Sequence, residues 1–126
     1  MLNKLRQQAS EVLSTARQIV LSAGGPADIQ VETLPCESVG LDLYVLVPRT
    51  SDLLFNLESD SVVVATADTW QMRGVARLLK SHEYPDQLTI ASAPEAELSE
   101  VVEIRPTRLQ LRPVGGQAQG ETIGIW

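Results

Sequence analysis

The sequence predicts one mainly β domain with flanking helices, in which six to eight mostly antiparallel strands form a sheet closed on itself. Short apolar or alternating segments recur from residue 18 to the C-terminus, whereas only two segments have helical periodicity. With so few helices to cover it, a sheet best buries its apolar face and removes its edges by closing. A chain of 126 residues suits a single domain. We expect that domain to span 1–126, with an N-terminal helix over 1–17, a barrel over 18–112 and a C-terminal turn and strand over 113–126.

The two helices are predicted from different signals. In the first, apolar residues recur every three or four positions; they are Leu2, Leu5, Ala9, Val12, Leu13 and Ala16. The second is a short central helix in "TSDLLFNLESD". Ser51 can cap its first turn, and Asp52 is favourable at its positive end. Its buried side is then formed by Leu53, Leu54 and Leu57.

Most strands are predicted from apolar alternation or from continuous apolar runs. "QIVLSA" follows the first helix, and "DIQVETL" alternates Ile29, Val31 and Thr33 with polar residues, which is the period of a half-buried strand. "LDLYVLVP" follows Gly40, and "SVVVATA" follows the central helix. Further along, "LTIAS" predicts a short strand and "APEAELSE" a polar connection or helical turn. In the tail, a glycine-rich turn precedes a last alternating pair, Ile123 and Ile125.

Two strands contain signs of a bend. In "DTWQMRGVARLL" one face holds Trp70, Met72, Gly74, Ala76 and Leu78, which we expect to be the core side. A glycine in mid-strand marks a bend, a bulge or a close backbone approach. In "VVEIRPTRLQLRP" the parity of the apolar residues changes across Pro106, which also requires a bulge or bend.

Composition excludes several functions. The net charge of -6 and the sequence pI near 4.7, with no long basic block, make nucleic acid a poor partner. No apolar run reaches the roughly 18–20 residues that span a bilayer, and the N-terminus is not that of a signal peptide, so we expect a cytoplasmic protein. Cys36 is the only cysteine and His82 the only histidine. We interpret Cys36 as a half-buried structural side chain and expect no metal site.

Three stretches resemble the split β-barrel of the pyridoxamine 5'-phosphate oxidase-related family, whose members often bind FMN. They are "LYVLVPRTSDLLFNLESDSVVVAT", "WQMRGVARLL" and "VVEIRPTRLQL". The first resembles the family's strand, serine-containing loop, short helix ending in Asn-Leu and apolar strand, and the third its proline-interrupted late strand. The resemblance covers about residues 41–112 and depends on the order and spacing of the stretches.

The resemblance implies that FMN lies at a dimer interface, with its phosphate held by the loop before the short helix. Ser51 matches the family's loop serine, and Asn56 and Leu57 match its helix end. The basic residues that usually follow that serine are here Asp52 and Leu53, and an acid opposes phosphate binding. Arg49 could supply the missing cation, with hydroxyl donors from Thr50 and Ser51; the alternative is that Arg49 and Asp52 form a surface pair.

The strand that contains Trp70 also offers candidate contacts to a flavin. Trp70 could pack on the ring system, and Arg73 or Arg77 could face its phosphate or ribityl chain. The alternative places Trp70 in the core and the arginines in solvent. We expect Arg105 and Arg108 mainly to shape the surface.

Two functional hypotheses follow. One is an FMN-binding homodimer, an FMN-dependent reductase or oxidase in which the cofactor supplies the electron chemistry. The other is a split-barrel homodimer without flavin that acts as a ligand-binding or structural protein. The sequence has no Ser-His-Asp set and no glycine-rich phosphate loop, so no catalytic residue is predicted.

Overall fold

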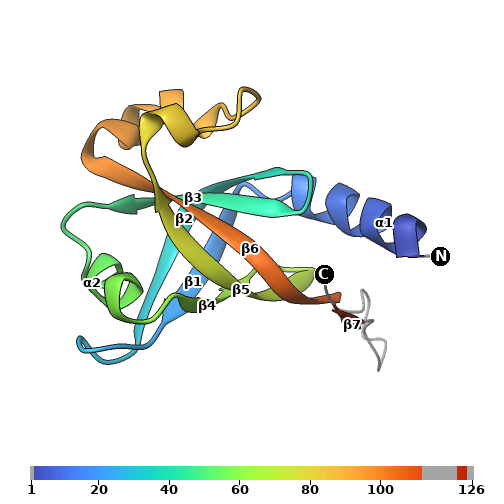
Figure 1. Cartoon of the computed structure of the whole chain (residues 1–126), viewed down its shortest axis with the longest axis horizontal. Helices are drawn as coiled ribbons and strands as arrows, with labels where there is room; N and C mark the ends of the chain where they lie inside the picture. Colours follow the sequence, from blue (N-terminus) through green and yellow to red (C-terminus); the bar gives the residue numbers. More distant parts are fainter. Residues whose placement is uncertain (1, 112–121, 125–126) are drawn as a thin grey trace.

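In the described part of the chain, seven antiparallel strands form a single sheet. Six of these strands close into a barrel (Figure 1). The computed structural model describes residues 2–111 and 122–124. The strands are β1 (Gln18–Ala23), β2 (Gln30–Val39), β3 (Asp42–Pro48), β4 (Val62–Thr66), β5 (Trp70–Leu79), β6 (Ser99–Leu111) and β7 (Thr122–Gly124). The sheet order is β3-β2-β1-β4-β5-β6-β7, and pairing of β3 with β6 closes the ring. The predicted fold class, mainly β with two flanking helices, is confirmed.

The two helices occupy different ends of the molecule. Helix α1 (Leu2–Ser14) extends to one side of the barrel, and α2 (Asp52–Ser59) lies near the opposite side (Figure 1). Ala9 and Leu13 of α1 are buried in the main core. Ser51 caps α2 as predicted, because its hydroxyl oxygen accepts a hydrogen bond from the Leu53 amide.

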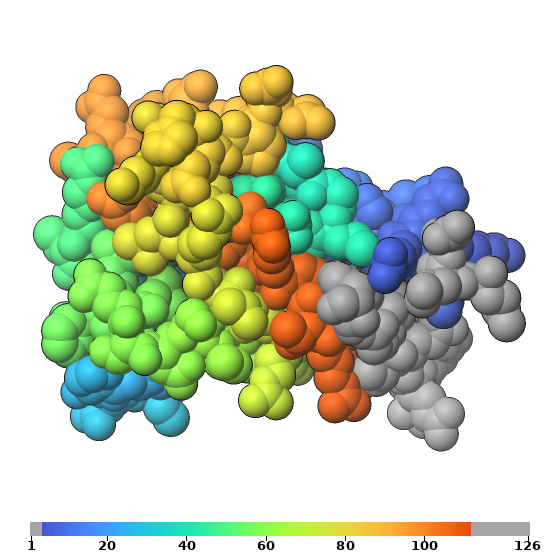
Figure 2. Space-filling model, in the orientation of Figure 1, coloured from blue at the N-terminus to red at the C-terminus, as the bar shows by residue number. Residues whose placement is uncertain are grey.

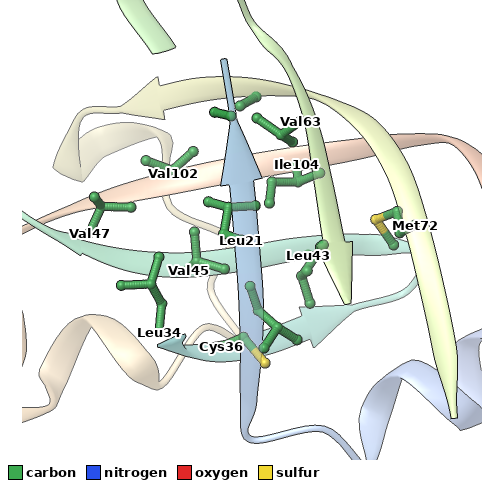
Figure 3. Close-up of a cluster of buried hydrophobic side chains, with 14 of the residues drawn as sticks. Leu21, Leu34, Cys36, Leu43, Val45, Val47, Val63, Met72, Val102 and Ile104 are labelled. Carbon is green, nitrogen blue, oxygen red and sulfur yellow. The ribbon is translucent and has the colours of Figure 1, made fainter. Parts of the chain in front are cut away.

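The barrel interior is filled by apolar side chains from every strand of the ring. Figure 3 shows part of this core, including Leu21 of β1, Val45 of β3 and Ile104 of β6. Trp70 and Met72 are also fully buried, and the expected core face of β5 holds from Trp70 to Ala76. It was wrong at Leu78, which is 37% exposed, because Leu79 is the buried residue there and packs in the second apolar cluster, outside the main core. Burial of each large side chain stabilises the fold by about 1.5–3 kcal/mol relative to its exposed state.

Strand β2 alternates as predicted, but with the opposite face inside. Leu34 and Cys36 are buried, whereas Ile29 and Val31 are 76% and 57% exposed. The register with β1 explains this, because Leu34 lies opposite the buried Ile19 and directly paired residues share a face. The expectation that Ile29, Val31 and Thr33 form the buried side was therefore wrong.

A bulge in β6 accounts for both predicted signs of a bend. Gly74 pairs with Pro106 and Arg73 with Arg108, so Thr107 is the extra residue. A Cβ atom on Gly74 would lie 2.6 Å from the Arg105 carbonyl oxygen, so only glycine fits there. The Thr107 hydroxyl donates a 3.1 Å hydrogen bond to the Arg73 carbonyl and fixes the extra residue in place.

The segment between β5 and β6 contains three 3-10 turns and no strand. They are η1 (Ser81–Glu83), η2 (Ile90–Ser92) and η3 (Pro94–Leu98). The strand predicted over "LTIAS" was wrong, whereas the helical turn predicted over "APEAELSE" is η3. The Glu37 carboxylate accepts hydrogen bonds from the Thr89 and Ile90 amides, and these contacts hold η2 in its turn. The segment buries Leu88 and Ile90 on the outside of the barrel.

A single asparagine joins α2 to the turn between β1 and β2. Asn56 is fully buried; its amide group donates to the carbonyls of Ala23 and Asp28, and its oxygen accepts from the Ala27 amide. Gly25 lies so close that a Cβ atom there would be 2.7 Å from the Asn56 Oδ1 atom. The position of α2 therefore depends on this side chain.

Candidate functional site

The loop before α2, where the resemblance places a flavin phosphate, has its polar groups engaged within the chain. Arg49 forms a 3.2 Å ion pair with Glu100 of β6, so its predicted alternative partner, Asp52, is not the one observed. The Arg49 amide also donates to the Leu98 carbonyl. Arg49 is thus directed along the outside of the barrel toward β6.

Ser51 makes two contacts that define the start of α2. Its hydroxyl accepts from the Leu53 amide and donates to the carboxylate of Glu32 in β2. Since Glu32 lies opposite the inward-facing Leu21, it reaches the helix N-terminus from the inner face of the strand. A carboxylate at this position is favourable, because the free amides and the helix dipole form an anion-binding end.

These contacts make the loop a poor site for a flavin phosphate. A dianionic phosphate here would meet the carboxylates of Glu32 and Asp52 and would have to displace the Ser51 contact. Sequence reasoning had recognised Asp52 but not Glu32, which lies 19 positions from Ser51. The described residues of this loop do not fit the phosphate of FMN.

Trp70 lies in the core and does not line a face open to a ligand. Its side chain is fully buried, with Met72 and Leu109 among the buried side chains of the same core. A flavin ring could not stack on this indole unless the barrel opened. The placement agrees with the alternative interpretation of Trp70 as a core residue. Arg73, by contrast, is exposed on the outer face of β5, so the structure separates these two predicted contacts.

Arg73 lies in a groove on the outer face of β4, β5 and β6, which we call the arginine groove. Its volume is about 440 Å³, and it is lined by Val62, Val64, Gln71, Arg73, Arg108 and Gln110. Arg73 and Arg108 are direct cross-strand partners, and so are Gln71 and Gln110. The surfaces of β5 and β6 lie side by side toward the viewer in Figure 2. None of the described residues that line the groove carries a carboxylate.

The other arginines of β5 and β6 differ from this pair because they contact carboxylates. Arg77 pairs with Glu83 at 2.8 Å and with Glu103 at 3.4 Å, and Arg105 lies 3.3 Å from Glu103. Glu103 is buried and also accepts a hydrogen bond from the Tyr44 hydroxyl. Burial and this bond raise the pKa of Tyr44. This cluster is a satisfied structural network.

A second groove, of about 690 Å³, lies beside the connection between α1 and β1. Its polar lining includes Thr15, Arg17, Gln18, Thr33, Thr66, Asp68 and Thr69. Arg17 and Asp68 give it both signs of charge, so it has no clear preference for an anion or a cation.

Sequence reasoning found Arg73 as a site candidate but assigned Arg108 to the surface. The missing information was the exact position of the bulge. The alternation of inward and outward residues does not by itself tell which residue of β6 lies opposite Arg73. In the part of the chain that the structure describes, no group of three His, Cys, Asp or Glu residues is arranged to bind a metal. Neither described helix combines the length and hydropathy needed to cross a bilayer.

Solved structures with the same fold are numerous, although no protein-family model and no curated protein matches the sequence. The general stress protein 26 from Bacillus anthracis superposes with a TM-score of 0.69 at 14% identity, covering 96% of this chain and 98% of that one. A putative pyridoxamine 5'-phosphate oxidase from Listeria innocua gives 0.63 at 12% identity, covering 85% and 97%. An FAD-binding protein from Mesorhizobium loti gives 0.56 at 12% identity, covering 82% and 88%. These likenesses confirm the split-barrel fold that the resemblance implied.

Proposed function

We propose that this chain is a split-barrel homodimer without flavin that acts as a ligand-binding protein, because the loop at residues 49–51 does not fit the phosphate of FMN. The observation that carries the proposal is the contact between Ser51 and Glu32, which puts a carboxylate where the resemblance requires a phosphate. The ion pair of Arg49 with Glu100 supports it, because this guanidinium is already neutralised on the other side of the loop.

The experiment is a titration of FMN with the purified protein, followed by flavin fluorescence and by the visible absorbance band. We expect neither quenching nor a spectral shift at micromolar concentrations. Quenching that saturates with one flavin per chain would overturn the proposal and establish flavin binding. Riboflavin, which lacks the phosphate, is the control that separates ring binding from phosphate binding.

A second candidate is the FMN-binding oxidoreductase that the resemblance implied. It is favoured by the fold, which this chain shares with a putative pyridoxamine 5'-phosphate oxidase and with an FAD-binding protein. Fold likeness alone does not transfer a reaction. For this candidate to hold, flavin would need a phosphate site other than the 49–51 loop.

The homodimer is supported by apolar side chains on the outer face of the sheet. Ile29, just before β2, and Val31, in β2, are 76% and 57% exposed on the outer side of that strand. Neither residue lines the arginine groove, so a partner seated on them can leave the groove open. Exposed apolar surface of this kind is typical of an interface, and a second copy of the chain can cover it isologously.

Light scattering coupled to size exclusion tests this assembly. We expect the wild-type mass to be twice the 13.7 kDa of one chain at micromolar concentration. Val31→Glu places a charge in the apolar face and is expected to give monomers. Leu98→Glu is the matched control, because Leu98 is an exposed apolar residue on η3. A monomeric wild type, or a dimeric Val31→Glu variant, would contradict the proposed dimer.

A further inference from the structure

We propose that the arginine groove binds the dianionic phosphate group of a small phosphate monoester, with Arg73 and Arg108 as its two cationic ligands. This inference deepens the proposed function and rests on it, because it names the ligand class of a binding protein. The six residues that line the groove provide two guanidinium groups, two carboxamides and two valines.

The groove brings two like charges together across neighbouring strands. Arg73 and Arg108 lie directly opposite each other on neighbouring strands, and both are exposed. Cβ atoms of such a pair are about 4.5–5.5 Å apart, a distance at which like charges destabilise a sheet. A bound dianion would convert this repulsion into two attractive contacts, with the planar guanidinium donors directed at its oxygens.

Among the residues that the structure describes, these two charges have no acidic partner. Acidic residues outnumber basic ones by 16 to 10 in the sequence. Arg49, Arg77 and Arg105 all contact carboxylates, whereas among the described residues no ion pair involves Arg73 or Arg108. The groove is therefore a positively charged site on an acidic protein.

The backbone bulge in β6 brings the two arginines to the same face. Without the bulge, a regular ladder continuing from the pair of Gly74 and Pro106 would set Thr107 opposite Arg73 and turn Arg108 to the other face. The bulge restores Arg108 to the outer face, and the Thr107 hydroxyl bond to the Arg73 carbonyl holds it there. Gly74 permits the close approach that this geometry needs.

The other four residues of the groove fit the organic group that is esterified to the phosphate. Gln71 and Gln110 form the neighbouring cross-strand pair, so their carboxamides lie beside the two arginines. Val62 and Val64 of β4 add an apolar wall on one side. A volume of about 440 Å³ has room for a phosphate with a small apolar group.

Isothermal titration calorimetry with phenyl phosphate tests the proposal, with phenol and inorganic phosphate as comparison ligands. We expect saturable binding of phenyl phosphate, weaker binding of inorganic phosphate and none of phenol. Arg73→Gln and Arg108→Gln are each expected to weaken binding by roughly tenfold or more, since each removes a charge-assisted contact. Arg17→Gln is the matched control, because it removes the same charge from an exposed residue outside the groove, and it should change the affinity less than about twofold.

The charge state of the ligand gives a second readout. The second pKa of a phosphate monoester is about 6, so binding should weaken between pH 7.5 and pH 5 as the dianion is protonated. Circular dichroism and light scattering establish that the arginine variants keep the wild-type fold and mass. Absence of saturable phenyl phosphate binding, or an equal loss in Arg17→Gln, would overturn the proposal.

The result also separates this inference from the proposed function. Binding of FMN that is lost in Arg73→Gln would contradict the flavin-free proposal and still support the anion site. Failure of phenyl phosphate to bind, with no FMN binding either, would remove the anion site and leave the flavin-free proposal standing.

Discussion

Ser51 caps helix α2 with its hydroxyl oxygen and donates its proton to the carboxylate of Glu32 in β2. One hydroxyl thus joins the helix start to a strand 19 positions earlier in the chain. The same contact places negative charge at the end of the helix that attracts anions. It is therefore both a structural link and the reason why we look for the ligand site elsewhere.

Ser51→Ala is expected to destabilise the protein by about 1–2 kcal/mol, because it removes the helix cap and the partner of Glu32. Urea unfolding followed by circular dichroism measures the change. Ser51→Thr keeps the hydroxyl and should recover most of the loss. Equal stability of Ser51→Ala and wild type would mean that the cap does not hold α2 in solution.

Gly74→Ala is expected to lower the free energy of unfolding by about 1–3 kcal/mol, because the added Cβ atom would lie 2.6 Å from a backbone oxygen in a packed barrel. Gly24→Ala is the control, since a Cβ atom there has no heavy atom within 4 Å. Thermal unfolding of the two variants compares them directly. A Gly74→Ala variant as stable as Gly24→Ala would contradict the described bulge geometry.

Asn56→Ala should destabilise the fold by about 2–4 kcal/mol, because three hydrogen bonds that tie α2 to the turn after β1 are lost together. Gln110→Ala, on the exposed outer face of β6, should change the stability by less than about 0.5 kcal/mol. Denaturant unfolding gives both values. If the two variants were equally stable, Asn56 would not be the anchor of α2.

Cys36 gives a prediction for alkaline pH. Burial raises the pKa of its thiol from 9.0 to about 11, so the unfolded chain loses this proton at lower pH than the folded chain. The protonated thiol therefore contributes fully to the free energy of unfolding below pH 9. This contribution is lost as the pH rises toward 11. Unfolding free energies measured from pH 8 to 11 should fall more steeply for wild type than for Cys36→Ala. Parallel curves for the two proteins would contradict the burial of this thiol.

The sequence was most informative where a local pattern alone decides the structure. The cap at Ser51, the bend at Gly74 and the parity change at Pro106 each predicted a feature that the structure contains. The prediction of the buried face of β2 was wrong, because Ile29 and Val31 are apolar but lie on the outer side. Register with β1 determines that choice, and register is a property of two strands.

The candidate site depends more on long-range strand pairing than these local features do. Glu32 meets Ser51, and Arg108 meets Arg73, only after β1 to β6 have closed into a ring. No residue type or spacing near Ser51 signals the approach of Glu32. The strand expected at 88–92 failed for a similar reason, because Glu37 of β2 binds the amides of Thr89 and Ile90 and stabilises a 3-10 turn instead.

The central claim is that an anion binds the barrel at Arg73 and Arg108 and avoids the start of α2. Two-dimensional ¹H–¹⁵N NMR of the labelled protein during titration with phenyl phosphate tests it most directly. We expect the largest amide shifts on residues 71–73 and 108–110, and unchanged shifts on residues 49–53. Shifts centred on residues 49–53 would contradict it and return the anion site to the loop.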